Sequence, residues 1–433
     1  MSDFSLIKDS PRMFASQANS WGDFCSSYIL KKSEDKLLEG VDEDNIVFLV
    51  DSIIYSAIER KASDIHLEPS RNDLRVRYRI DGVLYSQPSI YWTQKLLVIS
   101  RLKVLSSLDI AESRKPQDGK ISIIFCKSVE GGIEQKINID LRISTFPSIF
   151  GEKMVIRILD QSRNCINLNS LGFHLNILNQ VIDSIKKTSG FFLVCGPTGC
   201  GKTTTLYAML SSLDKRKLNI VTMEDPVEYN IEGICQSQVN SKAGFDFENG
   251  MRAILRQDPD VIMVGEIRDK STVSMAIEAA LTGHLVFSTL HTASAAGAIV
   301  RLIEMGVEPF LINASLSGVL AQTLVRKLCE NCKFEVELTK QEKYYLENKG
   351  VFLKTVFKAK GCRSCQNKGY DGRVACAELI LLNDEIRSLI LEKSHASKIE
   401  EVAIKNGMIL IKDDLLKKLQ DGVISLEEYL SNL

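Results

Sequence analysis

Apolar positions in the first part of the chain predict a small α/β domain. From 45 to 61 the apolar residues recur at helical spacing, which predicts an amphipathic helix. Residues 74–80 alternate apolar and charged side chains, as a half-buried strand does, and Asp81-Gly82 after them predicts a hairpin turn. The other expected elements are a helix over 93–108, a loop over 114–119, and strands over 121–126, 137–145 and 153–159. We therefore expect an α/β domain over 45–159.

Later in the chain, short apolar runs alternate with amphipathic helices. Strands are expected over 191–195, 220–223, 261–264 and 285–290, and helices over 204–213, 251–255 and 273–281. This order predicts a mostly parallel sheet with helices on both faces. The polar, asparagine-rich stretch 160–170 is interpreted as a linker, because it has few apolar residues. It separates the first domain, with its extension over 1–44, from a second domain over 171–433.

Composition and charge narrow the class of protein. With 433 residues, 45% of them hydrophobic and 25% charged, the chain is typical of a globular protein with more than one domain. Lys and Arg number 54 against 55 Asp and Glu, so no basic field would attract nucleic acid, and no nucleic-acid partner is expected. The start lacks a basic segment followed by an apolar one, and the longest uncharged run, 310–325, is short for a bilayer span. A cytoplasmic protein is expected.

The segment after the strand at 191–195 is typical of a nucleotide site. It reads GPTGCGKT and fits the phosphate-binding P-loop pattern, in which glycines let backbone N–H groups surround an anion at the start of a helix. Lys202 would lie between the β- and γ-phosphates, and the Thr203 hydroxyl would bind Mg²⁺. A glycine-rich turn with a chance lysine is the alternative. The expected nucleotide-binding residues are Gly196, Pro197, Thr198, Gly199, Cys200, Gly201, Lys202, Thr203 and Thr204.

Carboxylates follow two of the expected strands. Glu224 and Asp225 come after the strand at 220–223, at the edge of the sheet that carries the P-loop, where a carboxylate can orient water or hold a hydrated metal. Acids on the surface after a strand are equally common. After the strand at 261–264, Gly265 stands where most P-loop enzymes have a metal-binding aspartate, and Glu266 follows. Glu266 is a candidate for activating water or for an outer contact to Mg²⁺.

Two histidines bracket the strand expected over 285–290. His284 precedes the strand and His291 follows it. Histidines beside strands are often structural groups held by hydrogen bonds. Because this strand follows the one that leads to Glu266, both histidines are also candidates for sensing the γ-phosphate.

Two Cys-x-x-Cys pairs predict a metal centre. Cys329 with Cys332, and Cys362 with Cys365, supply four thiolates that can close a tetrahedral structural Zn²⁺ site. The gap between the pairs is longer than in a short ribbon, so a helical hairpin is expected over 339–349. Unrelated buried thiols are the alternative interpretation.

Four ordered motifs resemble those of the secretion ATPase superfamily, and within it the type II secretion and type IV pilus assembly ATPases. They are the P-loop at 196–204, an Asp box at 223–229, a Walker B segment at 256–269 and a His box at 282–292. Four segments of the first domain resemble that family's second amino-terminal domain, a PAS-like α/β module. These are 62–66, 81–82, 116–119 and 140–145.

The resemblance implies an α/β architecture with a PAS-like domain and a RecA-like P-loop ATPase domain that includes a zinc-binding tetracysteine element over 326–370. It implies a homohexamer that hydrolyses ATP at the cytoplasmic face of the inner membrane, peripherally associated with it. The motor would power type IV pilus assembly or type II secretion through a polytopic inner-membrane platform protein, together with a bitopic membrane anchor protein. The tetracysteine motif is generally absent from pilus retraction motors. A retraction motor, a nucleic-acid translocase or helicase, and a catalytically silent scaffold are the alternatives.

The resemblance also assigns residue roles. Arg142 and Arg157 match arginines that reach toward the γ-phosphate, whereas the pattern alone would make them solvated charges on alternating strands. Glu224 and Glu266 would share the work on water and metal, and the resemblance leaves open which is the general base. Cys200 stands where the family usually has serine. We hypothesise that this thiol, at the start of a helix, has a lowered pKa and reacts readily with thiol reagents.

Overall fold

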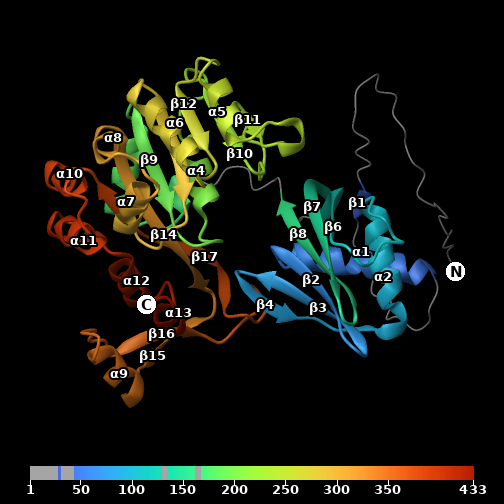
Figure 1. The fold of residues 1–433 in the computed structure, drawn as a ribbon. Coiled ribbons are helices and arrows are strands. Elements are labelled where there is room, and N and C mark those ends of the chain that lie inside the picture. The colour runs from blue at the N-terminus through green and yellow to red at the C-terminus, as the bar shows by residue number, and fades with distance from the viewer. Residues whose placement is uncertain (1–27, 31–42, 129–133, 161–166) are drawn as a thin grey trace.

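The structure is a computed structural model that describes residues 28–30, 43–128, 134–160 and 167–433. Figure 1 shows two lobes, an amino-terminal one in blue and teal and a carboxyl-terminal one in green to red. The expected extension over 1–44 lies outside the described residues apart from strand β1, Tyr28–Leu30, and the first residues of helix α1. Strand β1 pairs in parallel with β6, at the edge of the first sheet.

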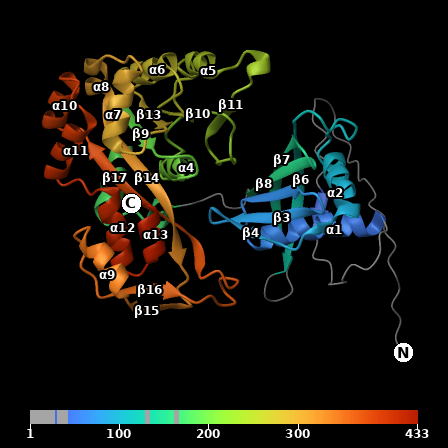
Figure 2. The ribbon, with the colours of Figure 1, turned by 60° about the horizontal axis from the view of Figure 1, so that its bottom comes forward.

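The amino-terminal lobe is an eight-stranded sheet with two helices on one face. The strands run in the order β1-β6-β7-β8-β2-β3-β4, with β5 paired to β3. In both views α2 lies on the side of the sheet away from the carboxyl-terminal lobe (Figures 1 and 2). The elements after β1 are α1 Glu43–Glu59, β2 Asp64–Pro69, β3 Asp73–Ile80, β4 Val83–Ser86, β5 Ile90–Tyr91, α2 Trp92–Leu105, β6 Gln117–Ser128, β7 Glu134–Ser148 and β8 Gly151–Asp160.

Alternation along these strands separates a core face from a charged face. Leu67, Leu141 and Ile156 are fully buried and pack in one cluster with Val98 of α2. Because successive side chains of a strand point to opposite faces, the residues between them lie on the face without helices. Arg142 of β7 and Arg157 of β8 are direct partners in the register on that face.

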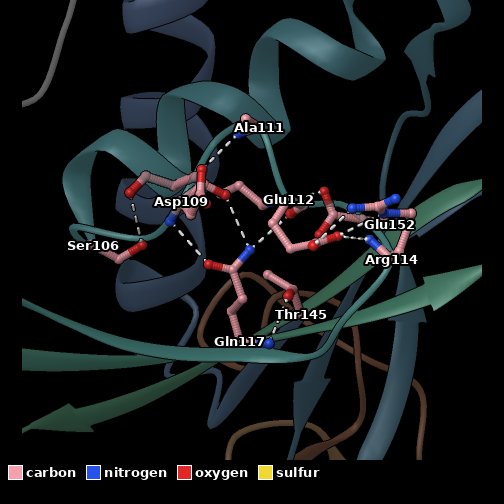
Figure 3. Close-up of polar contacts among 9 residues, drawn as sticks. Ser106, Asp109, Ala111, Glu112, Arg114, Gln117, Thr145 and Glu152 are labelled. Atoms are coloured by element: carbon pink, nitrogen blue, oxygen red, sulfur yellow. Dashed lines mark hydrogen bonds and ion pairs between the residues drawn. The ribbon is translucent and has the colours of Figure 1, made fainter.

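The connection between α2 and β6 is held by the first residue of β6 (Figure 3). The Gln117 backbone N–H donates to Thr145 Oγ1 at 3.1 Å, and its amide Nε2 donates to the carbonyls of Asp109 at 3.0 Å and Glu112 at 2.8 Å. The loop expected over 114–119 therefore ends earlier than predicted, since Gln117 to Gly119 already pair with β7.

The carboxyl-terminal lobe is built on a seven-stranded sheet in the order β11-β10-β12-β13-β9-β14-β17. Neighbours from β11 to β14 are parallel, and β17 is antiparallel. Phe191 and Leu193 of β9 join one apolar cluster, whereas Phe192 and Val194 join another, so both faces are covered as expected. The strands are β9 Gly190–Cys195, β10 Ile220–Glu224, β11 Cys235–Gln238, β12 Val261–Val264, β13 Leu285–Leu290, β14 Leu316–Leu328 and β17 Tyr370–Leu381.

Helices surround this sheet and continue to the end of the chain (Figure 2). They are η2 Leu168–Ser170, α3 Leu175–Ile185, α4 Lys202–Ser211, η3 Ser241–Ala243, α5 Phe247–Ile254, α6 Lys270–Leu281, α7 Ala295–Glu304, α8 Pro309–Ser315, α10 Asp384–Leu391, α11 Ala396–Lys405, α12 Ile411–Gln420 and α13 Leu426–Ser431. None of the helices in the described part of the chain combines the length and apolarity that a bilayer span requires. The uncharged run at 310–325 forms most of α8 and the buried strand β14 instead.

The end of the expected linker packs with the second lobe. Residues 161–166 lie outside the described ones, but Leu168 in η2 is 2% exposed and shares a cluster with Phe173 and Leu206. The one apolar residue of this short turn is thus part of the core. The division into domains stays a prediction, with 167–170 attached to the carboxyl-terminal lobe.

The segment between the two cysteine pairs differs from the expectation. It contains a two-stranded antiparallel sheet, β15 Lys333–Glu337 with β16 Thr355–Ala359, and one helix, α9 Lys340–Glu347, between the strands. The helical hairpin expected over 339–349 is therefore wrong. Thr339 and Glu342 form a capping box at the start of α9, and the helix ends before Gly350, which has φ of 74°.

Candidate functional site

The P-loop connects β9 to α4, so strand, loop and helix follow in the predicted order. Gly196, Gly199 and Gly201 have φ of 149°, 80° and 88°, values that only glycine adopts readily. At Gly196 an added Cβ would lie 2.4 Å from the carbonyl oxygen of Gln322 on β14. Local conformation and close approach of a second strand therefore both require glycine here.

Lys202 begins α4 and lies beneath the loop. Its Nζ donates to the carbonyls of Gly196 at 2.8 Å and Pro197 at 3.1 Å, and lies 3.5 Å from His291 Nδ1. The side chain of Lys202 is buried, whereas Thr203 at the next position is exposed. The ammonium and the hydroxyl that are expected to contact phosphate and Mg²⁺ are thus adjacent at the start of the helix.

A charged network extends from Lys202 along the carboxyl ends of the parallel strands. His291, directly after β13, places Nε2 3.2 Å from Glu266 Oε2. Glu266 also pairs with Arg268, whose Nη1 lies 3.6 Å from Asp225 Oδ2. Strands β9, β13, β12 and β10 are successive parallel neighbours, so their carboxyl ends meet at one edge. The structure thus brings Lys202, His291 and Glu266 together at this edge.

Glu224 has a different environment. It is the last residue of β10 and is 2% exposed. Its carboxylate accepts hydrogen bonds from the Tyr207 hydroxyl, from Thr222 Oγ1 at 2.6 Å and from Gln236 Nε2 at 3.2 Å. Burial raises the pKa of Glu224, although these hydrogen bonds oppose the shift. Its oxygens are occupied within the core and do not join the network around Glu266.

The carboxylates of this segment that solvent reaches are Asp225, which is exposed, and Glu228, which is half-buried. From the sequence, Glu224 and Asp225 are the candidates in this segment, and no role is given to Glu228. Pro226 was the available signal, because proline ends a strand and the residues after it leave the sheet.

The two histidines lie at opposite ends of β13. His284 Nδ1 lies 2.8 Å from the Ala279 carbonyl oxygen and 3.2 Å from Thr282 Oγ1, at the end of α6. A strand of 6 residues at about 3.3 Å each separates it from the P-loop edge by roughly 20 Å. Of the two histidines, the structure thus places His291 at the P-loop edge and His284 at the α6–β13 turn, and a role for either in sensing the γ-phosphate stays a prediction.

The two arginines of the amino-terminal lobe make different contacts. Arg142 Nη2 donates to the Val227 carbonyl at 3.0 Å, so it reaches across to the segment after β10. Arg157 Nε lies 3.3 Å from Asp64 Oδ1 on β2, and its side chain is 60% exposed. A second contact between the lobes places Lys368 Nζ 3.7 Å from Asp81 Oδ2.

The hypothesis that Cys200 has a lowered pKa is wrong. Cys200 is 3% exposed, and burial raises the pKa of its thiol, with only partial opposition from nearby Lys202. We expect Cys200 to contribute through its backbone, as the P-loop requires.

The four cysteines of the two pairs lie close together. Their Sγ atoms are all within 4.8 Å of one another. The pairs Cys329–Cys362 and Cys332–Cys365 are 3.8 Å apart, and Cys362–Cys365 is 3.7 Å apart. A tetrahedral zinc with Zn–S bonds of about 2.3 Å places its sulfurs about 3.8 Å apart. The cluster therefore fits a structural zinc site.

Comparison with known proteins identifies the family. The model of the family described as "Type II/IV secretion system protein" matches residues 39–431. This chain belongs to that family. The Type II secretion system protein E of Pseudomonas aeruginosa is 46% identical over 399 residues, covering 92% of this chain and 77% of the relative. The Type IV pilus assembly ATPase PilB of Myxococcus xanthus is 43% identical over 403 residues, covering 92% and 69%.

Solved structures of similar proteins have the same architecture. The pilus retraction motor PilT with bound ADP is 26% identical with a TM-score of 0.57, covering 88% of this chain and 96% of PilT. The ATPase DotB of Legionella pneumophila has a TM-score of 0.65 at 20% identity, covering 94% and 98%, and shows the fold alone. The family and the fold class expected from the sequence are confirmed, and this type II/IV secretion system protein is an ATPase.

Proposed function

We propose that this ATPase is a homohexameric motor at the cytoplasmic face of the inner membrane, where it drives a polytopic platform protein and contacts a bitopic anchor protein. The observation that carries the proposal is the contact of Lys202, on the P-loop helix, with His291, which contacts Glu266 in turn. This arrangement supplies a phosphate-binding cation and a carboxylate for water at one edge of one sheet.

The P-loop residues would hold the phosphates of ATP. Lys202 has two backbone carbonyls as acceptors, and we propose that it exchanges them for β- and γ-phosphate oxygens, which bind an ammonium more strongly because they are charged. The exposed Thr203 hydroxyl would bind Mg²⁺, which neutralises phosphate charge when bound.

Of the two glutamates, we propose Glu266 as the group that activates water. Its side chain is 19% exposed and it lies beside His291, whereas the oxygens of Glu224 accept hydrogen bonds inside the core. The two ring nitrogens of His291 face Glu266 and Lys202. His291 would therefore hold Glu266 in place and respond to movement of the Lys202 ammonium.

We propose that Arg142 and Arg157 stabilise the charge that develops on the phosphoryl oxygens. Both lie on the sheet face that carries no helix, and Arg142 already contacts the segment after β10. Each guanidinium would stabilise this charge only when the two lobes close. Its position would therefore couple hydrolysis to motion of the amino-terminal lobe.

The four cysteines would hold Zn²⁺, which links the end of β14 to the connection between β16 and β17. We propose secretion or pilus assembly as the process served. The tetracysteine cluster and the identity of 43–46% to assembly and secretion ATPases support this choice over retraction.

Isolation from membranes tests the proposal. Glu266→Gln holds ATP without turnover under this proposal, so it should retain the platform protein on an affinity column with ATP, while Lys202→Ala should not. Retention of the same membrane protein by both variants would contradict ATP-dependent coupling. Stimulation of turnover by single-stranded DNA would favour a nucleic-acid translocase instead.

A further inference from the structure

Tyr207 lies on the P-loop helix and joins it to the segment after β10. Its side chain is 1% exposed, and its hydroxyl donates to the carboxylate of Glu224. The same oxygen accepts from the Glu228 backbone N–H at 3.3 Å and from Gln236 Nε2 at 3.4 Å. A single hydroxyl on α4 thus contacts the end of β10, the following loop and strand β11.

Gln236 and Tyr229 make further contacts that fix the loop after β10. Gln236 Nε2 also donates to the Tyr229 carbonyl at 3.2 Å, and its Oε1 accepts from the Ile231 N–H at 2.7 Å. The rings of Tyr207 and Tyr229 pack edge to face with centroids 4.6 Å apart. Tyr207 and Glu224 are buried and Gln236 is half-buried, so loss of one partner leaves another polar group of the cluster unsatisfied.

The loop held in this way carries the contact to the other lobe. Between Asp225 and Glu228, Val227 accepts from Arg142 at 3.0 Å and donates its own N–H to Gln238 Oε1 at 3.2 Å. The Glu228 N–H, which donates to the Tyr207 hydroxyl, and the Val227 carbonyl, which accepts from Arg142, belong to the same peptide bond. A shift of the Glu228 N–H would therefore move the Val227 carbonyl as well.

We propose that Tyr207 is a positioning residue for ATP hydrolysis, whose hydroxyl fixes residues 225–229 against the P-loop helix and so sets where Arg142 docks. It lies five residues after Lys202 in α4, about 7.5 Å along a rigid helix. Displacement of the phosphate-binding end of α4 is thereby transmitted to the Val227 carbonyl. This inference rests on the proposed role of Arg142 in turnover.

A double-mutant cycle tests the coupling between Tyr207 and Arg142, which make no direct contact with each other. Tyr207→Phe removes only the hydroxyl; we expect kcat to fall by about tenfold, while the KM for ATP stays within about twofold. In an Arg142→Ala background the same change should alter kcat by less than about twofold, because the docking it supports is already lost. Gln236→Leu, which removes the neighbouring amide, should show the same dependence.

Tyr78→Phe is the matched control. The Tyr78 hydroxyl is also buried and donates to the Ile53 carbonyl at 2.8 Å, within the amino-terminal lobe. Its removal should have the same effect on kcat with and without Arg142. Equal effects of Tyr207→Phe in the two backgrounds would overturn the proposal.

Amide hydrogen exchange gives a reading without turnover. In Tyr207→Phe the amides of 227–231 should exchange faster than in the wild type, whereas in Tyr78→Phe they should not. Wild-type exchange there in Tyr207→Phe would overturn the proposed positioning. A third outcome separates the two proposals. If the amides of 227–231 exchange faster in Tyr207→Phe but Arg142→Ala turns over normally, the role of Arg142 is refuted, whereas the contact between Tyr207 and the loop after β10 stands.

Discussion

The carboxyl ends of β10 and β12 are adjacent, and each leads to a glutamate, yet the two glutamates differ in environment. Glu224 is 2% exposed and accepts hydrogen bonds from Tyr207, Thr222 and Gln236. Glu266 is 19% exposed and contacts His291 and Arg268. The same sequence signal, an acid after an apolar strand, has thus led to a buried, hydrogen-bonded carboxylate in one case and to a partly exposed carboxylate in a charged network in the other.

Gly265 lies close to the backbone of β10. A Cβ there would lie 3.3 Å from the Met223 carbonyl oxygen, and the Gly265 N–H donates to that oxygen at 2.8 Å. The chain after β12 can therefore pass close to β10 before it turns. Ile267 is buried at 4% exposure, so Glu266 before it faces the P-loop edge.

The largest effect is expected from Arg142 and Arg157, which would act on a triphosphate held by the P-loop and Lys202. Arg142→Ala and Arg157→Ala should bind nucleotide normally but lose turnover by up to about 10³ to 10⁵, the range for an arginine that stabilises transferred phosphoryl charge. Turnover assays with a fluorescent nucleotide titration measure both quantities. Normal turnover in both variants would remove the amino-terminal lobe from the chemistry.

A smaller effect should separate the two histidines. His291→Ala removes the group between Lys202 and Glu266, and we expect turnover to fall by about 10²-fold. His284→Ala, at the opposite end of β13, should change turnover by less than about twofold, as surface substitutions do. Equal losses in the two variants would mean that the network around Glu266 has no special role.

Glu224→Gln sharpens the comparison through stability. Burial raises the pKa of Glu224 above its ordinary value of 4.5, so the folded state favours the protonated form. The stabilisation is complete below that value and is lost as pH rises through the raised pKa. Since glutamine cannot ionise, the Tm of the variant minus that of the wild type should increase as the pH rises above 4.5 and through the raised pKa of Glu224. A difference that is constant with pH would show that Glu224 does not titrate there.

Local patterns predicted much of the fold and part of the site. Strands β12 and β13 have the predicted bounds, because short apolar runs between turns have few alternatives. Strands β14 and β17 were missed, since an uncharged run and a cysteine-containing segment carry no clear period. The roles of Glu224 and His284 depend on what lies opposite them, Tyr207 in one case and the Ala279 carbonyl in the other. Tertiary contacts of this kind are not visible in a local pattern.

The most direct test of which glutamate activates water is the steady-state turnover of Glu266→Gln and of Glu224→Gln, measured side by side at saturating ATP and Mg²⁺. The account predicts that Glu266→Gln binds ATP and loses about 10² to 10⁴ in kcat, the usual contribution of a positioned base, while Glu224→Gln loses at most about tenfold. The opposite order of losses would contradict it and place the reactive carboxylate at the end of β10.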